Sequence, residues 1–277
     1  MSRRSKRNQP RAMPKSKQFT LFAMGIYAFM NLPILVLIIF SFDDSRLAVD
    51  WHGFTLKWYA RLLNNEAVGQ ALANSLIVAS VAVFFATIMG VLVAVGLYKA
   101  HFRGAGLAKG LIVLPVIVPE IAMAVAALIL FIAMGMPLGL ASIIVAHIIF
   151  CLSYVALTVM ARLEGMNPYL IEAAMDLGAT PVQAFFKVTL PLLQPGIISG
   201  ALLAFVLSLD DFVITQFTAG VGATTLPLRI YSMVKFGVSP EINALSTLML
   251  AATIMVTLSA EWIRTRSEKL QVDRGSL

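Results

Sequence analysis

Three carboxylates interrupt long apolar runs of this chain and are its first candidate functional residues. Glu120 lies in the apolar run 110–134, and Asp210 and Asp211 lie in the run 196–218. A carboxylate at the centre of a bilayer costs roughly 2.5 kcal/mol or more, so it marks a functional site by default. None of the apolar runs holds a Lys or Arg, so only a partner subunit would supply a basic residue to pair with. We therefore expect the three acids to line a water-filled path for a cation.

The rise of an α-helix sets the depth of these acids. At about 1.5 Å per residue, Asp210 lies about 20 Å beyond Gly196, where its run begins. By the same measure, Glu120 lies about 15 Å beyond Gly110. Both depths fall between the middle of the membrane and its outer half. Adjacent residues of a helix point about 100° apart, so one of Asp210 and Asp211 should face the path and the other a neighbouring helix or subunit.

Other polar groups lie close to these acids in the sequence. Pro119 removes a backbone hydrogen bond directly before Glu120 and exposes a carbonyl oxygen nearby. Broken helices with exposed carbonyls and carboxylates suit a polyammonium ion. Ser208 adds an acceptor, unless its hydroxyl bonds to its own backbone, as serine more often does in a span. His147 and Cys151 lie four residues apart, but two ligands without a third favour packing over a metal site.

The composition places these acids in a membrane protein. Of the 277 residues, 59% are hydrophobic and 13% are charged, and the mean hydropathy is +0.87. Soluble domains are about 25% charged. One cysteine excludes an internal disulfide, and no GxxxxGK[ST] loop is present to bind a nucleotide. The sequence predicts an all-α integral membrane protein with six transmembrane helices within 19–42, 68–98, 110–134, 140–160, 196–218 and 242–262.

The basic residues are distributed unevenly between the segments that join these spans. Sixteen of the 21 Lys and Arg residues lie in 1–18, 99–109, 161–191 and 263–277, which alternate with the other loops. By the positive-inside rule, both termini are expected in the cytoplasm. The formal net charge of +7 then reflects basic residues at the inner leaflet, and lipid rather than nucleic acid is the expected partner.

The segment 161–191 predicts two short helices joined by a bend. Asn167 can cap the first helix, with Pro168 at its first helical position. Gly178 suits the end of that helix, because only glycine takes a left-handed backbone at low cost. Such a rigid elbow between two spans is suited to docking on another protein, although a soluble connector can have the same pattern.

The second short helix has its own boundary signals. Thr180 can cap it, and Gln183 three residues later completes a capping box. The pair Leu190 and Pro191 is expected to end it, because the residue before a proline disfavours helical geometry.

The elbow resembles the EAA loop of permease subunits of ABC importers. The pattern is Glu-Ala-Ala, three residues, Gly, nine residues and Val-Thr-Leu-Pro, and it includes Glu172, Ala173, Ala174, Gly178, Leu190 and Pro191. The family usually has isoleucine where this chain has Val188. The resemblance implies the MetI-like fold of type I importer permeases. It also implies that these six residues couple the permease to an ATPase.

Further stretches resemble spermidine/putrescine (polyamine) permease subunits, the PotC and PotI type. They are 54–59, 208–214, 225–228, 230–235 and 237–245. The resemblance runs from about residue 26 to residue 262 and leaves out the basic N-terminal extension. Where the family carries aspartate this chain has Glu120, which keeps the charge on a longer side chain. The candidate substrate pathway comprises Asp210, Asp211, Glu120, Ser208 and Trp58, and for Trp58 an interfacial anchor is the favoured interpretation.

The resemblance also implies the setting and the partners. They are a bacterial inner (plasma) membrane, a second homologous permease, two cytoplasmic ATPase subunits that bind ATP and Mg, and an extracytoplasmic polyamine-binding protein. No cofactor, metal or enzymatic activity is expected in this chain. The expected organisation is a basic tail 1–18, a first helix and external loop 19–67, a permease core 68–262 with the coupling loop 161–191, and a basic tail 263–277.

Other functions remain open. The chain could serve an ABC importer of another small cationic solute. An ion-coupled secondary transporter would also use intramembrane acids, but it would usually show internal repeats and more spans. A membrane scaffold would use the elbow, but it has no need for acids in its spans.

Overall fold

The structure, a computed structural model, describes residues 17–45, 50–98, 103–167, 169–235, 237 and 239–275. Side chains are described within 19–259 of these. Most of the basic N-terminal tail, Pro168 and the start of the loop 99–109 therefore lie outside the described residues, and the C-terminal tail is described through its backbone alone.

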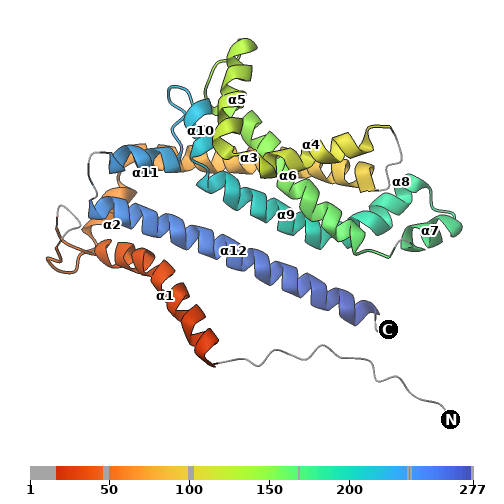
Figure 1. Ribbon diagram of the computed structural model, residues 1–277, viewed down its shortest axis with the longest axis horizontal. Helices are drawn as coiled ribbons and strands as arrows, with labels where there is room; N and C mark the ends of the chain where they lie inside the picture. The colour runs from red at the N-terminus through yellow and green to blue at the C-terminus, as the bar shows by residue number, and fades with distance from the viewer. Residues whose placement is uncertain are drawn as a thin grey trace.

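The described residues are helical, apart from turns, loops and one isolated β-bridge between Asp43 and Phe54. In chain order the elements are α1 (Lys17–Phe40), α2 (Lys57–Leu63), α3 (Glu66–Tyr98), α4 (Ala105–Ile117), α5 (Glu120–Ala133), α6 (Leu140–Glu164), α7 (Tyr169–Asp176), α8 (Pro181–Ala184), the π-helix η1 (Phe185–Thr189), α9 (Leu190–Asp210), α10 (Val213–Thr218), α11 (Leu226–Val234) and α12 (Pro240–Gly275) (Figure 1).

The predicted number of spans is confirmed. Among the described residues, five helices are long and apolar enough to cross a membrane, and α4 with α5 makes a sixth, bent pair. The sequence predicted one broken helix over 110–134, but the two halves meet at an angle of 111°. Pro119 has no N–H to continue the helix and disfavours helical geometry at Val118, whose ψ is 134°. Pro119 predicted a break, and the structure gives the angle between the two halves.

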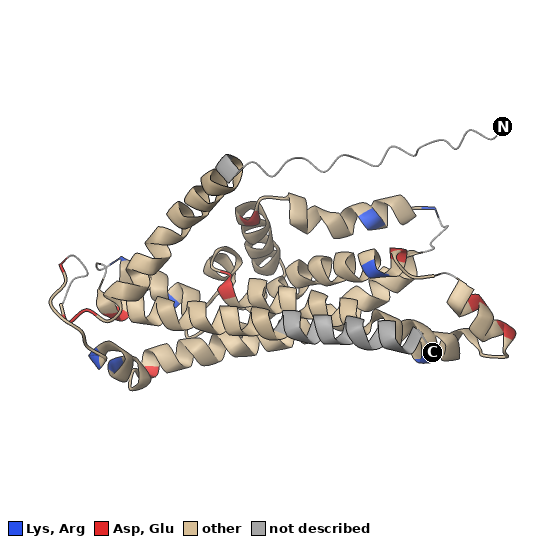
Figure 2. Cartoon of the chain, turned by 90° about the horizontal axis from the view of Figure 1, so that it is seen from below, with Lys and Arg blue, Asp and Glu red and all other residues tan. Residues whose placement is uncertain are grey.

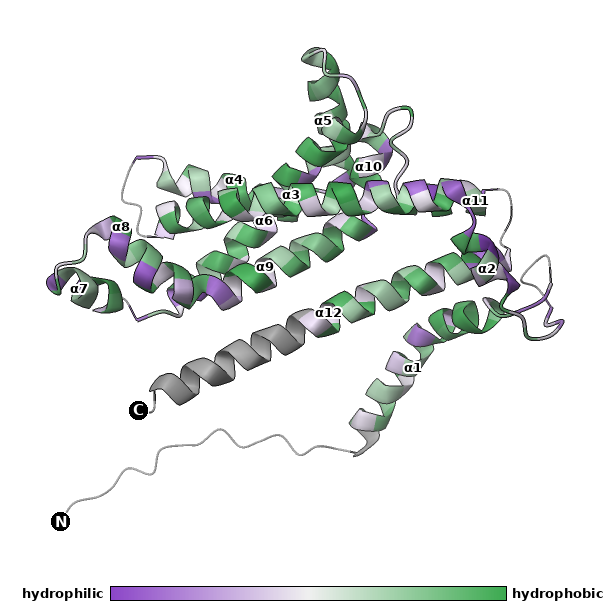
Figure 3. Ribbon diagram, turned by 180° about the vertical axis from the view of Figure 1, so that it is seen from behind, coloured by the Kyte–Doolittle hydropathy of each residue, from purple (hydrophilic) through white to green (hydrophobic). Residues whose placement is uncertain are grey.

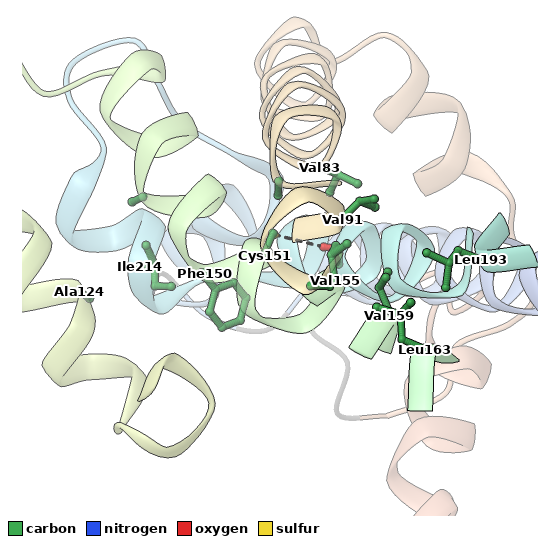
Figure 4. Close-up of a cluster of buried hydrophobic side chains, with 14 of the residues drawn as sticks. Val83, Val91, Ala124, Phe150, Cys151, Val155, Val159, Leu163, Leu193 and Ile214 are labelled. Atoms are coloured by element: carbon green, nitrogen blue, oxygen red, sulfur yellow. Dashed lines mark hydrogen bonds between the residues drawn. The ribbon is translucent and has the colours of Figure 1, made fainter. Parts of the chain in front are cut away.

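The core forms where α3, α6 and α9 cross. Gly90 of α3 and Gly200 of α9 both approach Val155 of α6, and a Cβ on Gly90 would lie 2.9 Å from a Val155 methyl group. Small residues allow membrane helices to pack this closely. Figure 4 shows the side chains that fill the core, and Cys151 lies among them as a buried free thiol. Close packing of α9 against α6 fixes the position of α9, which ends at Asp210.

Two pairs of helices, α5 with α10 and α1 with α12, lie beside the crossing of α3, α6 and α9. In Figure 1, α5 and α10 rise beside one another from the body, whereas α12 and α1 run along another side. Figure 3 shows that α5 is mainly hydrophobic along its length, and Ile121, Ile129 and Ile132 of α5 are exposed. The most apolar 18 residues of α1 include no buried residue.

Candidate functional site

Two broken spans bring the acids together. The first break separates α4 from α5, and α5 begins at Glu120. The second break follows Asp210, the last residue of α9. Asp211 is extended with ψ 126°, and α10 begins at Val213. The sequence predicted one continuous span over 196–218, which is wrong at this point. Since α5 packs against α10, acids that are 90 residues apart in the sequence lie in one region.

Asp211 is buried at the second break, and the short helix after it satisfies its carboxylate. The backbone N–H groups of Ile214 and Thr215 donate to it at 3.2 and 2.8 Å, and the Thr215 hydroxyl donates to Oδ2 at 2.8 Å. Asp211 lies one residue before Phe212, the N-cap of α10, and its side chain accepts from N–H groups in the first turn of that helix. The negative charge also suits the positive end of the helix dipole.

His147 of α6 completes this buried network. Its Nε2 lies 3.2 Å from Oδ2 of Asp211 and 3.1 Å from the Thr215 hydroxyl, and its Nδ1 lies 2.7 Å from the Ser208 hydroxyl. The Thr215 hydroxyl uses its one proton to donate to Asp211, so toward His147 it acts as an acceptor. The Nε2 atom of His147 therefore carries a proton. Nδ1 then accepts from Ser208 in the neutral ring or donates to it in the charged one.

Asp210 and Glu120 are exposed, in contrast to Asp211. The two neighbouring aspartates therefore lie in different surroundings, as expected, but the reason is that the helix ends between them rather than their rotation around one helix. Glu120 is the first residue of α5, and α5 packs against α10, the short helix that follows Asp211. The region thus combines an inner carboxylate with partners and two outer carboxylates that are open to other groups.

The metal face considered for His147 and Cys151 gains no support within the described part of the chain, where no group of three metal ligands occurs. His147 is committed to the network around Asp211. The Cys151 thiol lies 3.6 Å from the carbonyl oxygen of Ala204, to which it can donate. Both side chains therefore join α6 to α9 and α10, which agrees with the packing interpretation.

Trp58 lies away from the acids. It is 5% exposed and packs with Leu62, Val68 and Leu245. Its indole N–H donates to the carbonyl oxygen of Asp43 at 2.7 Å and so ties α2 to the segment after α1. The structure therefore brings together four of the predicted pathway residues, Glu120, Ser208, Asp210 and Asp211, but not Trp58.

The loop that Trp58 holds is also fixed through the Asp43 carboxylate. It accepts a hydrogen bond from the Ser45 hydroxyl and one of 2.7 Å from the His52 N–H. Burial by itself raises the pKa of Asp43, but these hydrogen bonds bring the pKa below its ordinary value.

The elbow forms at the far end of the molecule with the predicted caps. Asn167 accepts from the Tyr169 N–H at 3.0 Å, and Gly178 has the left-handed φ of +87°. Thr180 and Gln183 exchange side-chain and backbone hydrogen bonds of 3.0 and 3.3 Å. In α7, Glu172 and Ala173 are exposed, and no residue of that helix is buried. The elbow therefore presents its first helix outward.

The predicted end of the elbow at Leu190 and Pro191 is wrong. The chain continues from α8 through the π-helix η1 directly into α9, so Leu190 and Pro191 form the first turn of α9. Pro191 lacks the N–H that would continue the hydrogen-bond ladder from the preceding turn. The wider π turn just before it absorbs the irregularity. The elbow and the fifth span are thus one nearly continuous helical element.

Comparison with known proteins identifies the family. Residues 82–270 match the family described as "Binding-protein-dependent transport system inner membrane component". The chain belongs to this family. It is 43% identical to the "Spermidine/putrescine transport system permease protein PotC" of Escherichia coli (strain K12), over 87% of this chain and 92% of that protein.

A second relative and a solved structure extend the comparison. The "Putrescine transport system permease protein PotI" of the same strain is 43% identical, over 89% of this chain and 90% of that protein. A bacterial alginate ABC transporter, solved with an alginate pentasaccharide-bound periplasmic protein, shares the fold with a TM-score of 0.70 and 17% identity, over 90% of this chain and 95% of the other. The expected permease fold is thereby confirmed.

Sequence reasoning missed the partner of Asp211. It found no Lys or Arg in the spans, but it left out His147 as the group that meets the buried carboxylate. The signal was present, because a histidine inside a span is rare and tends to pair with another polar group. The role of Thr215 was less accessible, since it depends on the helix ending at Asp210.

Proposed function

We propose that this chain is the permease subunit of an ATP-binding cassette importer for polyamines, such as spermidine or putrescine, and forms half of the translocation pathway. The proposal rests on the family and on the two relatives that are named for these substrates. Membership in a binding-protein-dependent transport family favours this function over an ion-coupled secondary transporter or a scaffold.

The observation that carries the substrate class is the cluster of carboxylates at two broken spans. Glu120 and Asp210 are exposed, and Asp211 lies behind them in its own network. A polyamine carries several hydrated ammonium groups, and the loss of that water is costly unless carboxylates replace it. We assign Glu120 and Asp210 to direct contact with the cation. Asp211 and Ser208 hold the second break in shape.

The coupling role falls to the elbow. Glu172, Ala173, Ala174 and Gly178 lie on or directly after the outward helix α7, where a cytoplasmic ATPase subunit can reach them. Leu190 and Pro191 begin the helix that ends at Asp210. No loop separates α8 from η1 or η1 from α9. A movement of the elbow, caused by the ATPase, is therefore transmitted along α9 to Asp210 and Asp211. This continuity offers a physical route from ATP hydrolysis to the pathway.

The orientation follows from the charges. We propose that both termini and the elbow face the cytoplasm, and that the loops carrying α2 and α11 face the opposite side. Figure 2 shows almost no Lys or Arg along the long spans between their ends, and the orientation itself rests on the sixteen of 21 basic residues in the tails, the loop 99–109 and the elbow. The partners are then a homologous permease, two ATPase subunits that bind ATP and Mg, and an extracytoplasmic polyamine-binding protein.

The direct test is uptake by the whole complex in proteoliposomes. Radiolabelled putrescine and spermidine should enter only with ATP inside and the binding protein outside. Competition with other small cations separates a polyamine importer from the second candidate, a carrier of a different cationic solute. If the complex imports neither polyamine but takes up another cation, the substrate assignment is wrong while the family stands.

A further inference from the structure

A small cavity lies beside Arg229, on the side that we propose to be extracytoplasmic. Its volume is about 120 Å³. Ala67, Gln70 and Asn74 line it from the beginning of α3, and Thr224 and Arg229 line it from α11 and the loop before that helix. The α3 residues belong to the first turns of that span, and α11 lies in the segment between the last two spans, so the cavity lies at one end of the spans.

Arg229 is a cation that has no ion-pair partner among the residues that the structure describes. Its Nε is buried without a hydrogen-bond partner, and the guanidinium forms no ion pair within the described residues. Glu241, an acid of the same end of the molecule, is engaged by Arg61 at 3.9 Å and by Asn65 at 3.5 Å. Arg229 as a whole is only half-buried and lines the cavity, so its guanidinium can receive an anion that enters there.

The wall that carries Arg229 is held in place before any ligand arrives. The Asn74 amide donates to the carbonyl oxygens of Thr224 at 2.9 Å and Gly222 at 3.3 Å. The Leu226 N–H, at the beginning of α11, donates to the Ser75 hydroxyl at 2.8 Å. These bonds fix the loop and the first turn of α11 to α3. The guanidinium is therefore presented by a prearranged surface, which lowers the entropic cost of binding.

We infer that this cavity receives one carboxylate side chain, an aspartate or a glutamate, of the extracytoplasmic binding protein. The inference rests on the proposed function, which supplies that partner. The planar guanidinium matches a carboxylate through two parallel hydrogen bonds. The Gln70 amide can add a third donor. A polyamine is excluded as the ligand because it is a cation and Arg229 would repel it.

Affinity of the binding protein for the whole complex tests this. The complete complex is held in nanodiscs of neutral lipid, and its polyamine-loaded binding protein is titrated onto it. The Arg229→Gln variant should raise Kd roughly ten- to a hundred-fold, because it removes a charged hydrogen-bonded pair. The affinity should also become less sensitive to salt, while ATPase activity without binding protein stays unchanged. The Ala67→Phe variant should weaken docking similarly, because it fills the cavity and keeps the charge.

Lys235→Gln is the matched control. It removes one positive charge at the end of α11, where Lys235 is exposed and stacks on Tyr231, outside the cavity. Its Kd should stay near the wild-type value. Unchanged affinity in both Arg229→Gln and Ala67→Phe would overturn the inference. So would loss of the second permease subunit from the Arg229→Gln complex, which would assign the cavity to that subunit.

Lipid is the remaining occupant to separate. A difference that occurs only in nanodiscs of anionic lipid would assign the cavity to a headgroup phosphate and would also overturn the inference. Polyamine uptake by the wild-type complex is measured in the same preparation. Its absence would sink the proposed function, whereas normal uptake with unchanged Kd in both variants would sink the docking site alone.

Discussion

The imidazole Nε2 of His147 lies 3.2 Å from the carboxylate of Asp211, and each side chain is 1% exposed. This contact joins α6 to the break between α9 and α10. It explains how an acid can be buried among apolar helices without a Lys or Arg beside it. Removal of one member of such a pair leaves the other buried and unmatched, which is more costly than removal of both.

Replacement of His147 by phenylalanine tests the contact. The ring still fills the space, but Asp211 loses a partner, so we expect a destabilisation of up to about 3–5 kcal/mol. The melting temperature of the purified complex would report it. In His147→Phe with Asp211→Asn, the loss should be smaller than the sum of the two single losses. Additive losses would mean that the two residues do not interact.

The three acids should respond differently to loss of charge. Asp210→Asn and Glu120→Gln are expected to lower polyamine uptake roughly ten- to a hundred-fold each, with little change in melting temperature, because both are exposed and each would lose a charged hydrogen bond to substrate. Asp211→Asn should lower both uptake and melting temperature. Wild-type uptake in all three variants would show that the carboxylates are structural.

Much of this arrangement was predictable from local signals. The spans follow from apolar runs, and the caps at Asn167, Gly178 and Thr180 follow from backbone chemistry within a few residues. A histidine inside a span predicts some polar partner, but the sequence could not identify Asp211 as that partner, because the two residues lie 64 positions apart and their contact depends on how three helices cross. Proline likewise indicates where a helix is interrupted, but the tertiary contacts of α5 set the angle.

The same distinction explains the errors at helix ends. A Leu-Pro sequence such as Leu190-Pro191 fits either the end of one helix or the beginning of the next. Only the neighbouring turns decide between them, and the π-helix before Leu190 is a rare element with no clear sequence signal. The break after Asp210 has no proline or glycine to announce it. Apolar residues continue after Asp211, but α9 has already ended at Asp210.

The bend in the elbow should be necessary for coupling. Gly178 has a φ of +87°, so Gly178→Val forces a β-branched residue into a backbone that penalises it. We expect the complex to assemble while stimulated ATP hydrolysis and uptake fall together. Leu177→Val is the control, because Leu177 is 90% exposed and precedes the left-handed position. Normal transport by well-expressed Gly178→Val would rule out the coupling role.

Topology can be tested independently of transport. A reporter fused after Leu277 should behave as cytoplasmic, and one inserted near Asn64 as external, because basic residues concentrate on one side. An external C-terminus would place the elbow outside the cell and remove it from any ATPase.

The loop after α1 should make stability depend on acid pH. The pKa of Asp43 is lowered in the fold by its hydrogen bonds from Ser45 and His52, despite the opposing effect of burial. Its contribution is therefore complete above the unfolded pKa of about 3.9 and is lost as pH falls through the lower folded value. The melting temperatures of wild type and Asp43→Asn should converge below about pH 4. A gap that does not change with pH would refute this.

Trp58 offers the sharpest separation between a structural role and a place in the pathway. Its indole N–H donates to the Asp43 carbonyl oxygen, and its ring is buried between α2 and α12 neighbours such as Leu62 and Leu245. Trp58→Phe keeps an aromatic ring and loses one hydrogen bond, so it should cost about 1 kcal/mol of stability. Trp58→Ala also opens a cavity and should cost about 3–5 kcal/mol. If Trp58 acts only through packing, uptake per folded complex should be near wild type in Trp58→Phe. A large loss of uptake at unchanged melting temperature would instead place Trp58 on the substrate path.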